Sequence, residues 1–407
     1  MNVLHVESSL NWGGQEHRTL AETRWLNRHG HRAWIACNPQ SELRRRAGDC
    51  SLDLPMRGSF DPKASLAIRR LCRQSAIDVV HVHSPKDAWI CYPLHLAGVP
   101  VVRSRQITNP VKRKWSRSIV YRRGCARVIA TAECIRRDLI ERNRVDPRRI
   151  TVVGEGVDAQ EFHPGVDGAR FRAEFRVRTD AVLFGVVAMI RPEKGHLIFV
   201  RAALEMLRTH PTARFLIVGE GTGKREAESE VRALLRRHFG DEHSGPVIMT
   251  GFRTDTPSVM AALDALVVPS TAEAQSLVVP QAFATKRTVI ASAVGGLPEL
   301  VRHEDTGLLV TPGSPEALAA SMRRVADDVA LRERLAQRGY DYACHSLSFD
   351  RKMEQSLAAY VAAGAAEAGS LPRGNIVADG MTRRLQTFWR NCIMDRGAPR
   401  DMRSLAS

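Results

Sequence analysis

The sequence has 407 residues, a formal net charge of +16 at pH 7 and 44% hydrophobic residues. That length suffices for two domains, and the apolar content is that of a folded protein rather than a disordered one. The longest apolar run, Ala181 to Ile190, is about half of what a bilayer-spanning helix needs, and no signal peptide is recognisable. The eight cysteines form no C-x-x-C pair, which favours reduced thiols in a cytoplasmic protein.

Positive charge is concentrated in the first part of the chain. Residues 1–170 hold 29 Lys and Arg against 17 Asp and Glu, a net charge of +12, which leaves +4 for the rest. Nine basic residues and no acidic one lie between Arg103 and Arg127. Together with Trp115, this segment suits the anionic inner face of a membrane. Nucleic-acid binding is an alternative for so basic a chain, but the sequence contains no recognised reader motif, which disfavours it.

Short apolar runs alternate with helical stretches along most of the chain. Apolar strands separated by helices predict parallel sheets that are covered on both faces. In the first half we expect strands at Asn2–Val6, Ala33–Cys37, Ile77–His83, Val99–Arg103, Arg127–Ala130 and Ile150–Val153. In the second half we expect them at Val182–Ile190, Arg214–Val218, Val247–Thr250, Ala265–Val268, Thr288–Ala293 and Gly307–Val310.

Two features of the first half lie where such sheets bind ligands. Gly13 and Gly14 follow the first strand and open a helix, and glycines there let the backbone approach a ligand closely. His81 and His83 lie at the end of a later strand. Open α/β sheets bind ligands beyond the carboxyl ends of their strands, so His83 is a candidate site residue, although a solvent-capped histidine is the simpler alternative.

In the second half, the stretch from Pro269 to Glu299 has the most specific pattern. Ser276 is a good helix N-cap, and Pro280 is tolerated in the first turn of the helix that would follow. Free backbone N–H groups at Leu277 to Val279 and the helix dipole would form an anion site. Glu273 and Gln281 flank it with groups that bind hydroxyls, so the stretch predicts a site for a phosphorylated sugar.

This stretch resembles the signature of retaining glycosyltransferases of the GT-B fold, family 4. Glu273, Gln281 and Gly295-Gly296-Leu297-Pro298-Glu299 are in register with it, although the family usually has glutamate where this chain has Gln281. The resemblance implies an α/β protein with two Rossmann-like parallel-sheet domains that face each other across a cleft. It places an acceptor-side domain at 1–164, a nucleotide-sugar domain at 165–345 and a helix that crosses back to the first domain at 346–362.

The resemblance also assigns the donor side. Arg191 and Lys194 follow a strand and would clamp the pyrophosphate, although the family's usual arginine position holds Met189. Glu273 would orient the sugar hydroxyls and Gln281 the ribose. The expected donor-binding residues are Gly14, Gln106, Gly219, Phe252, Ser276, Leu277, Val278 and Gln281, and the expected catalytic group is Glu273, Arg191, Lys194 and His83.

On the acceptor side the resemblance points to Gly13, Gln15, Arg103 and Arg105. Gln106 stands where related sequences usually have histidine. With Gln281 this makes two ionisable positions occupied by amides, which hold hydroxyls but do not titrate. A sugar-nucleotide binder that no longer transfers is therefore an alternative from another functional class.

The expected activity is transfer of a sugar from a nucleotide diphosphate sugar to an acceptor hydroxyl with retention of configuration. No D-x-D metal pair is present in the sequence, and we expect neither a metal nor another cofactor. We expect the acceptor to be a glycan or a lipid-linked glycan of lipopolysaccharide or another surface polymer. We also expect a cytoplasmic enzyme that binds peripherally to the inner face of the membrane. Residues 363–407 predict a linker and a basic amphipathic tail, docked on the protein itself or on a membrane surface.

Overall fold

The computed structural model describes residues 1–107, 111, 115–221, 226–240 and 245–365. Contacts divide the chain into two compact units. Unit 1 comprises Met1–Ser104, Ile119–Arg127 and the chain from Tyr360 onward, and unit 2 comprises Arg105–Ser118 and Val128–Ala359. This division differs from the expected boundary at residue 164, because it assigns the last two strands of the first sheet to unit 2. The predicted tail lies outside the described residues, apart from its first three.

The first sheet has seven strands in the order β3-β2-β1-β4-β5-β6-β7. The pairings of β1 with β2 and β4 are parallel, as are those of β2 with β3 and of β4 with β5. The strands are β1 (Asn2–Glu7), β2 (Arg32–Cys37), β3 (Ser51–Asp53), β4 (Val79–Val82), β5 (Val101–Arg105), β6 (Arg127–Ala130) and β7 (Ile150–Val152). The helices of this part of the chain are α1 (Gly14–Arg28), α2 (Glu42–Ala47), α3 (Pro62–Gln74), α4 (Pro85–Leu96), α5 (Trp115–Arg122) and α6 (Glu133–Glu141).

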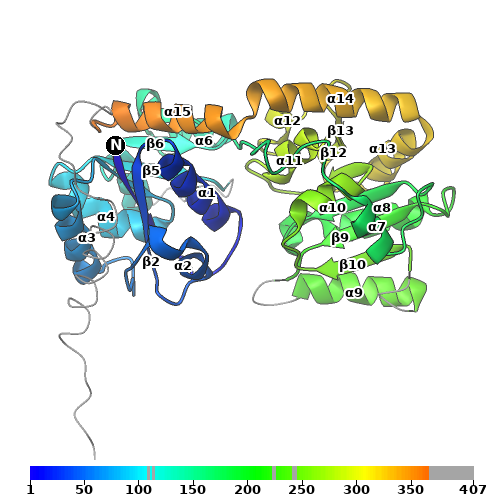
Figure 1. Ribbon diagram of the computed structural model, residues 1–407, viewed down its shortest axis with the longest axis horizontal. Helices are drawn as coiled ribbons and strands as arrows, with labels where there is room; N and C mark the ends of the chain where they lie inside the picture. Colours follow the sequence, from blue (N-terminus) through cyan, green and yellow to red (C-terminus); the bar gives the residue numbers. More distant parts are fainter. Residues whose placement is uncertain (108–110, 112–114, 222–225, 241–244, 366–407) are drawn as a thin grey trace, which may run out of the picture. The chain divides into compact units, whose positions relative to one another are not determined.

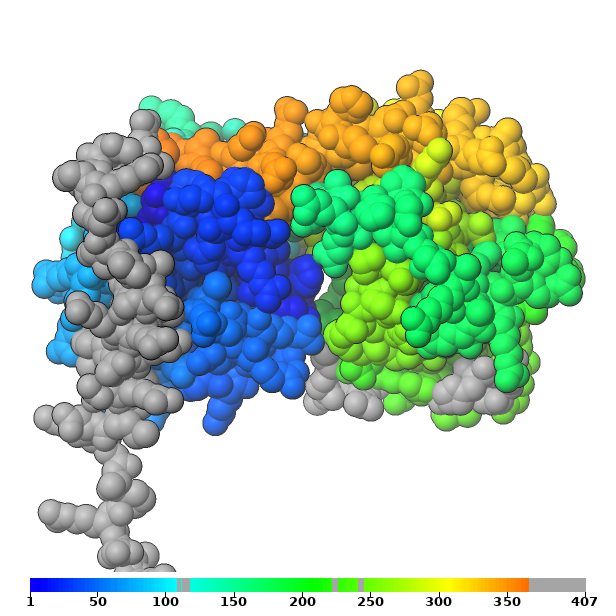
Figure 2. All heavy atoms as spheres, viewed as in Figure 1, coloured from blue at the N-terminus to red at the C-terminus, as the bar shows by residue number. Residues whose placement is uncertain are grey.

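The second sheet lies within unit 2 and has six parallel strands in the order β10-β9-β8-β11-β12-β13. They are β8 (Leu183–Val187), β9 (Arg214–Val218), β10 (Val247–Gly251), β11 (Ala265–Val268), β12 (Thr288–Ser292) and β13 (Leu308–Val310). The helices are α7 (Ala169–Glu174), α8 (His196–Met206), α9 (Glu226–Phe239), α10 (Thr256–Ala262), α11 (Val278–Ala284), α12 (Leu297–Leu300), α13 (Pro315–Asp327), α14 (Val329–Ser346) and α15 (Phe349–Ala362). In Figures 1 and 2, α14 and the start of α15 follow one another along the upper edge of the view.

Successive residues of the second sheet enter different cores. Leu183 packs in a cluster with Phe283, whereas its neighbour Phe184 packs in a second cluster with Phe199 and Phe215. Side chains of a strand alternate between the two faces of a sheet. A strand covered on both faces is therefore apolar at every position, which is why its apolar run was readable in the sequence.

All of the predicted strands are present, with ends shifted by up to three residues. The three-residue strand β3 was not predicted. The predicted N-cap at Ser276 is wrong: α11 begins at Val278, its N-cap is Leu277, and no side chain caps it. Within the described residues, no helix is both long and apolar enough to span a bilayer.

Candidate functional site

Loops that follow two neighbouring strands of unit 2 carry the best-defined group of predicted site residues. Lys194 is the last residue of a short 3-10 helix, Pro192–Lys194, which follows β8. Glu273 lies in the loop after β11. Their side chains form an ion pair, with Nζ 2.6 Å from Oε2. The strand order of the sheet reverses between β8 and β11, which is where open α/β sheets bind ligands. Two residues 79 positions apart are thus brought together as predicted.

Glu273 is 8% exposed but keeps bonding capacity. Its Oε2 also accepts a hydrogen bond from the Ser270 hydroxyl at 3.2 Å. No described residue donates to its Oε1. An ionised carboxylate accepts on both oxygens, so Oε1 is available to a ligand hydroxyl.

The two loops are held together by backbone contacts. The Thr271 N–H donates to the Glu193 carbonyl at 2.9 Å. Gly195 has φ +71°, and a Cβ there would lie 1.9 Å from the Pro269 carbonyl oxygen. Only glycine fits such a position, which accounts for the glycine that follows Lys194.

Arg191 starts the same loop, and its Nη2 lies 3.8 Å from the Met189 sulfur. Its guanidinium therefore lies beside the position where the family usually has arginine. This adds a second cation to the loop that carries Lys194.

Two of the remaining donor-side predictions, Gly219 and Phe252, directly follow the carboxyl ends of β9 and β10. Gly219 has φ +133°, and a Cβ there would lie 2.0 Å from the Ala188 carbonyl oxygen. Its N–H donates to the Gly251 carbonyl at 2.9 Å, and Phe252 is half exposed. Ser276, Leu277, Val278 and Gln281 lie at the start of α11, whose seven residues make it about two turns long.

The Gly-Gly-Leu-Pro-Glu segment proves to have a structural role. The Gly296 N–H donates to the Glu273 carbonyl at 3.2 Å, and a Cβ on Gly296 would lie 1.9 Å from the Ala274 carbonyl oxygen. The Glu299 carboxylate accepts from the N–H groups of Glu133 and Cys134, at 2.9 and 3.1 Å. These are the first two residues of α6, which has no side-chain cap of its own, so Glu299 caps that helix.

In unit 1, the glycine loop leads into α1, which begins at Gly14 with Gly13 as its N-cap. Gln15 donates from Nε2 to the Glu7 Oε2 at 2.6 Å. Burial, together with the neighbouring Asp87 and Glu16, raises the pKa of the Glu7 carboxyl well above its usual value. The sequence reading missed Glu7, whose position directly after an apolar strand was the available signal.

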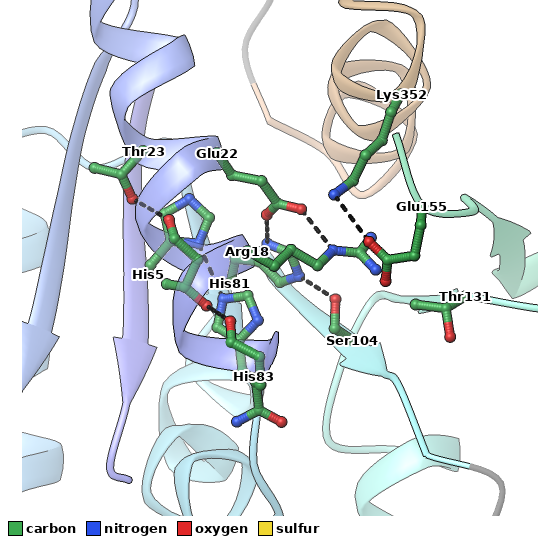
Figure 3. Close-up of polar contacts among 12 residues, drawn as sticks. His5, Arg18, Glu22, Thr23, His81, His83, Ser104, Thr131, Glu155 and Lys352 are labelled. Atoms are coloured by element: carbon green, nitrogen blue, oxygen red, sulfur yellow. Dashed lines mark hydrogen bonds and ion pairs between the residues drawn. The ribbon is translucent and has the colours of Figure 1, made fainter. Parts of the chain in front are cut away.

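His83 belongs to a buried group of three histidines (Figure 3). Its Nε2 lies 3.0 Å from the Nδ1 of His5, on the neighbouring strand β1. His81 is within hydrogen-bonding distance of two hydroxyls, that of Tyr360 at 2.8 Å from Nδ1 and that of Ser104 at 2.7 Å from Nε2. Burial lowers the pKa of His5 to about 4 and that of His83 well below its usual value, so both rings are neutral at pH 7.

The acceptor-side arginines differ in their surroundings. Arg103 on β5 is 3% exposed, and its guanidinium lies over the Tyr121 ring at 3.6 Å from the centroid. Arg105, at the end of that strand, is half-buried. Gln106 follows it, and its buried Nε2 has no hydrogen-bond partner among the described residues.

Comparison with protein families agrees with the arrangement of unit 2. The profile described as "Glycosyl transferases group 1" matches residues 181–328, and the profile described as "Glycosyltransferase Family 4" matches residues 12–161. Together they match well over half of the 407 residues. The chain belongs to the glycosyltransferase family that these two profiles describe, family 4 or group 1.

Curated relatives in the family match part of their length. The D-inositol 3-phosphate glycosyltransferase of Kineococcus radiotolerans is 32% identical over 262 residues, 61% of this chain and 60% of that protein. The UDP-Gal:alpha-D-GlcNAc-diphosphoundecaprenol alpha-1,3-galactosyltransferase of Escherichia coli is 27% identical over 290 residues, 67% of this chain and 72% of that protein. The chain thus spans 60% of the first of these relatives.

Solved structures of other glycosyltransferases share the fold. A Rickettsia africae glycosyltransferase has a TM-score of 0.77 at 20% identity and covers 89% of this chain and 98% of its own. Anabaena HepE, crystallised with UDP, has a TM-score of 0.76 at 19% identity, and the match covers 88% of this chain and 99% of the HepE chain. The predicted α/β class with two Rossmann-like GT-B domains is confirmed.

Proposed function

We propose that this glycosyltransferase-family chain moves a sugar from a nucleotide diphosphate sugar to an acceptor hydroxyl, with retention of configuration. The observation that carries the proposal is the ion pair between Lys194 and Glu273 at the strand-order reversal of unit 2. It puts a cation suited to phosphate beside a carboxylate suited to sugar hydroxyls.

Donor binding would rearrange this pair. The diphosphate would compete with Glu273 for the Lys194 ammonium, and Arg191 on the same loop would add a second charge-assisted contact. Each such bond is worth about 1.5–3 kcal/mol. Glu273 would then turn both carboxylate oxygens towards the sugar, while Gln281 would hold the ribose and the Gly219 and Phe252 loops the base.

Charge neutralisation by side chains would replace a metal in this mechanism. Lys194 and Arg191 supply two positive charges for the departing diphosphate. The leaving phosphate itself would accept the proton of the acceptor hydroxyl. We therefore propose that transfer proceeds without a divalent metal at the donor.

We propose an acceptor that is a lipid-linked or other surface glycan, such as lipopolysaccharide. The E. coli relative is named for a diphosphoundecaprenol-linked acceptor. The exposed residues of the basic segment from Arg103 to Arg127, among them Arg122 and Arg123, would attract the chain to an anionic membrane face. Sedimentation with anionic liposomes at low salt tests this, and a protein that stays in the supernatant contradicts it.

The donor is tested in two steps. A thermal-shift screen with UDP, GDP, ADP and CMP should single out one base, since a ligand at a hundred times its Kd stabilises by about 2.7 kcal/mol. Single-turnover assays with labelled sugars on that nucleotide should then give transfer or hydrolysis. Stabilisation without either reaction would support the binding-only alternative, and no stabilisation by any nucleotide would refute the proposal.

A further inference from the structure

The three histidines of unit 1 form a compact and dry cluster (Figure 3). His5 lies on β1, opposite His81 on β4 in the sheet register, and His83 lies just beyond the end of β4. Their exposed fractions are 0%, 1% and 5%. One ligand atom from each ring can be chosen so that all three lie within 4.8 Å of one another.

Hydrogen bonding leaves this cluster incomplete. A neutral imidazole has one N–H and one lone pair. The contact between His5 and His83 uses one of each, and the other two nitrogens, His5 Nε2 and His83 Nδ1, are buried without a partner among the described residues. Of these two nitrogens, one therefore carries an N–H and the other a lone pair, and neither has a partner within the described structure, in a site that is closed to water. If each ring carries its N–H on the outer nitrogen, the facing nitrogens His5 Nδ1 and His83 Nε2 both present lone pairs, and an ion between them would replace their hydrogen bond.

We propose that His5, His81 and His83 bind a divalent cation of the zinc class, as a structural site in unit 1. Neutral imidazole is the form that coordinates such ions, and nitrogen ligands favour zinc, copper or nickel over magnesium and calcium. The 3.0 Å between His5 Nδ1 and His83 Nε2 is close to the roughly 3.3 Å between two nitrogens of a tetrahedral zinc site with bonds of about 2.0–2.1 Å.

The surroundings provide orienting groups and a compensating charge. His81 would coordinate through one nitrogen, displacing one hydroxyl, and the hydroxyl of Tyr360 or Ser104 would remain to orient the ring. The Glu22 carboxylate has Oε2 4.0 Å from His81 Nδ1, close enough to offset part of the ion's charge. In this role His83 holds the ion, in place of the substrate contact predicted from the sequence.

The test uses the full chain without a polyhistidine tag, stripped with a chelator and dialysed against zinc alone. We expect about one zinc per chain for the wild type by mass spectrometry. His5→Gln and His83→Gln should each weaken zinc binding at least tenfold. His196→Gln is the matched control for zinc retention, because His196 is also buried but lies in unit 2.

A second measurement does not depend on the variants folding. X-ray absorption of the zinc-loaded wild type should show imidazole nitrogen ligands at about 2.0 Å. A wild-type chain that retains no zinc, thiolate ligands in place of imidazole, or equal affinity in wild type and a folded His5→Gln would overturn the proposal. Each of these outcomes is separate from the nucleotide screen, which reports on unit 2.

Discussion

The two sheets of the molecule reverse their strand order in the same way, between β1 and β4 in one and between β8 and β11 in the other, yet the polar groups at the two places differ. In the first sheet, His5 and His81 are within the strands themselves and are sealed from water. In the second, Lys194 and Glu273 are on loops beyond the strand ends, with 25% and 9% of their side chains exposed. Polar groups within the strands are therefore enclosed on all sides, whereas those on the loops beyond the strand ends keep part of their surface exposed.

The largest expected loss of stability at the loop site of Lys194 and Glu273 comes from Gly195→Ala. The substitution places a Cβ against the Pro269 carbonyl in a left-handed backbone, which should cost about 2–6 kcal/mol of unfolding free energy. Urea denaturation measures the loss. Gly313→Ala is the matched control, because Gly313 has φ +81° with no atom within 4 Å of the added Cβ, and it should cost only about 1–2 kcal/mol. Equal losses of unfolding free energy in the two variants would contradict the close approach of Gly195 to the Pro269 carbonyl.

Acidification tests the burial of the histidines in the first sheet. Burial lowers the pKa of His5 to about 4, against 6.5 for an exposed histidine. The folded state therefore binds fewer protons than the unfolded state between these values, and stability is full above pH 6.5 and falls until about pH 4. The contribution of His5 to this loss is about 3 kcal/mol. Urea denaturation of metal-free protein from pH 7.5 to 4.5 should show a shallower decline for His5→Gln than for the wild type, and identical slopes would refute the assignment.

Lys194→Met tests the charge at the loop site. It removes one charge-assisted contact to the proposed diphosphate and should weaken nucleotide binding by about tenfold to a hundredfold, equivalent to about 1.5–3 kcal/mol. Calorimetric titration with the nucleotide selected by thermal shift measures the change. Lys63→Met, at an exposed position of α3, should leave the affinity unchanged. A Lys194 variant that binds as tightly as the wild type would place the diphosphate elsewhere.

Tyr360→Phe produces the smallest expected effect and refines the view of the histidine cluster. It removes the hydroxyl that lies 2.8 Å from His81 Nδ1, at a position with no exposed surface. Loss of one buried hydrogen bond should lower the unfolding free energy by about 0.5–1.5 kcal/mol. Tyr340→Phe, at a partly exposed tyrosine of α14, is the control. No difference between the two variants would show that the hydroxyl contributes no net stability.

Sequence reasoning located the loop site and missed most of the buried one. Lys194 and Glu273 were identifiable because each follows an apolar strand in a family motif, and parallel strands end at the same edge of a sheet. The partnership of His5 with His83 depends on the register between β1 and β4, which joins residues 78 positions apart. Nothing local to His5 indicates that register.

Two local features were not predicted correctly. The strand β3 has three residues, Ser51 to Asp53, which is too short to show an apolar period. Ser276 is of a residue type that often caps helices, but its neighbour Gln275 is engaged in a long-range contact, in which its Oε1 accepts from the Glu155 N–H at 2.7 Å. The first helical residue is Val278 and the N-cap is Leu277, so the local capping preference of Ser276 is not realised.

The cap that Glu299 supplies to α6 also bears on how the chain acquires its structure during synthesis. The carboxylate comes from a residue 166 positions beyond the helix start, so α6 leaves the ribosome long before its cap exists. At about 5–20 residues per second, that interval lasts on the order of ten to thirty seconds. Throughout it the first-turn N–H groups of α6 lack this acceptor, and the cap can form only when translation has passed the Gly-Gly-Leu-Pro-Glu segment.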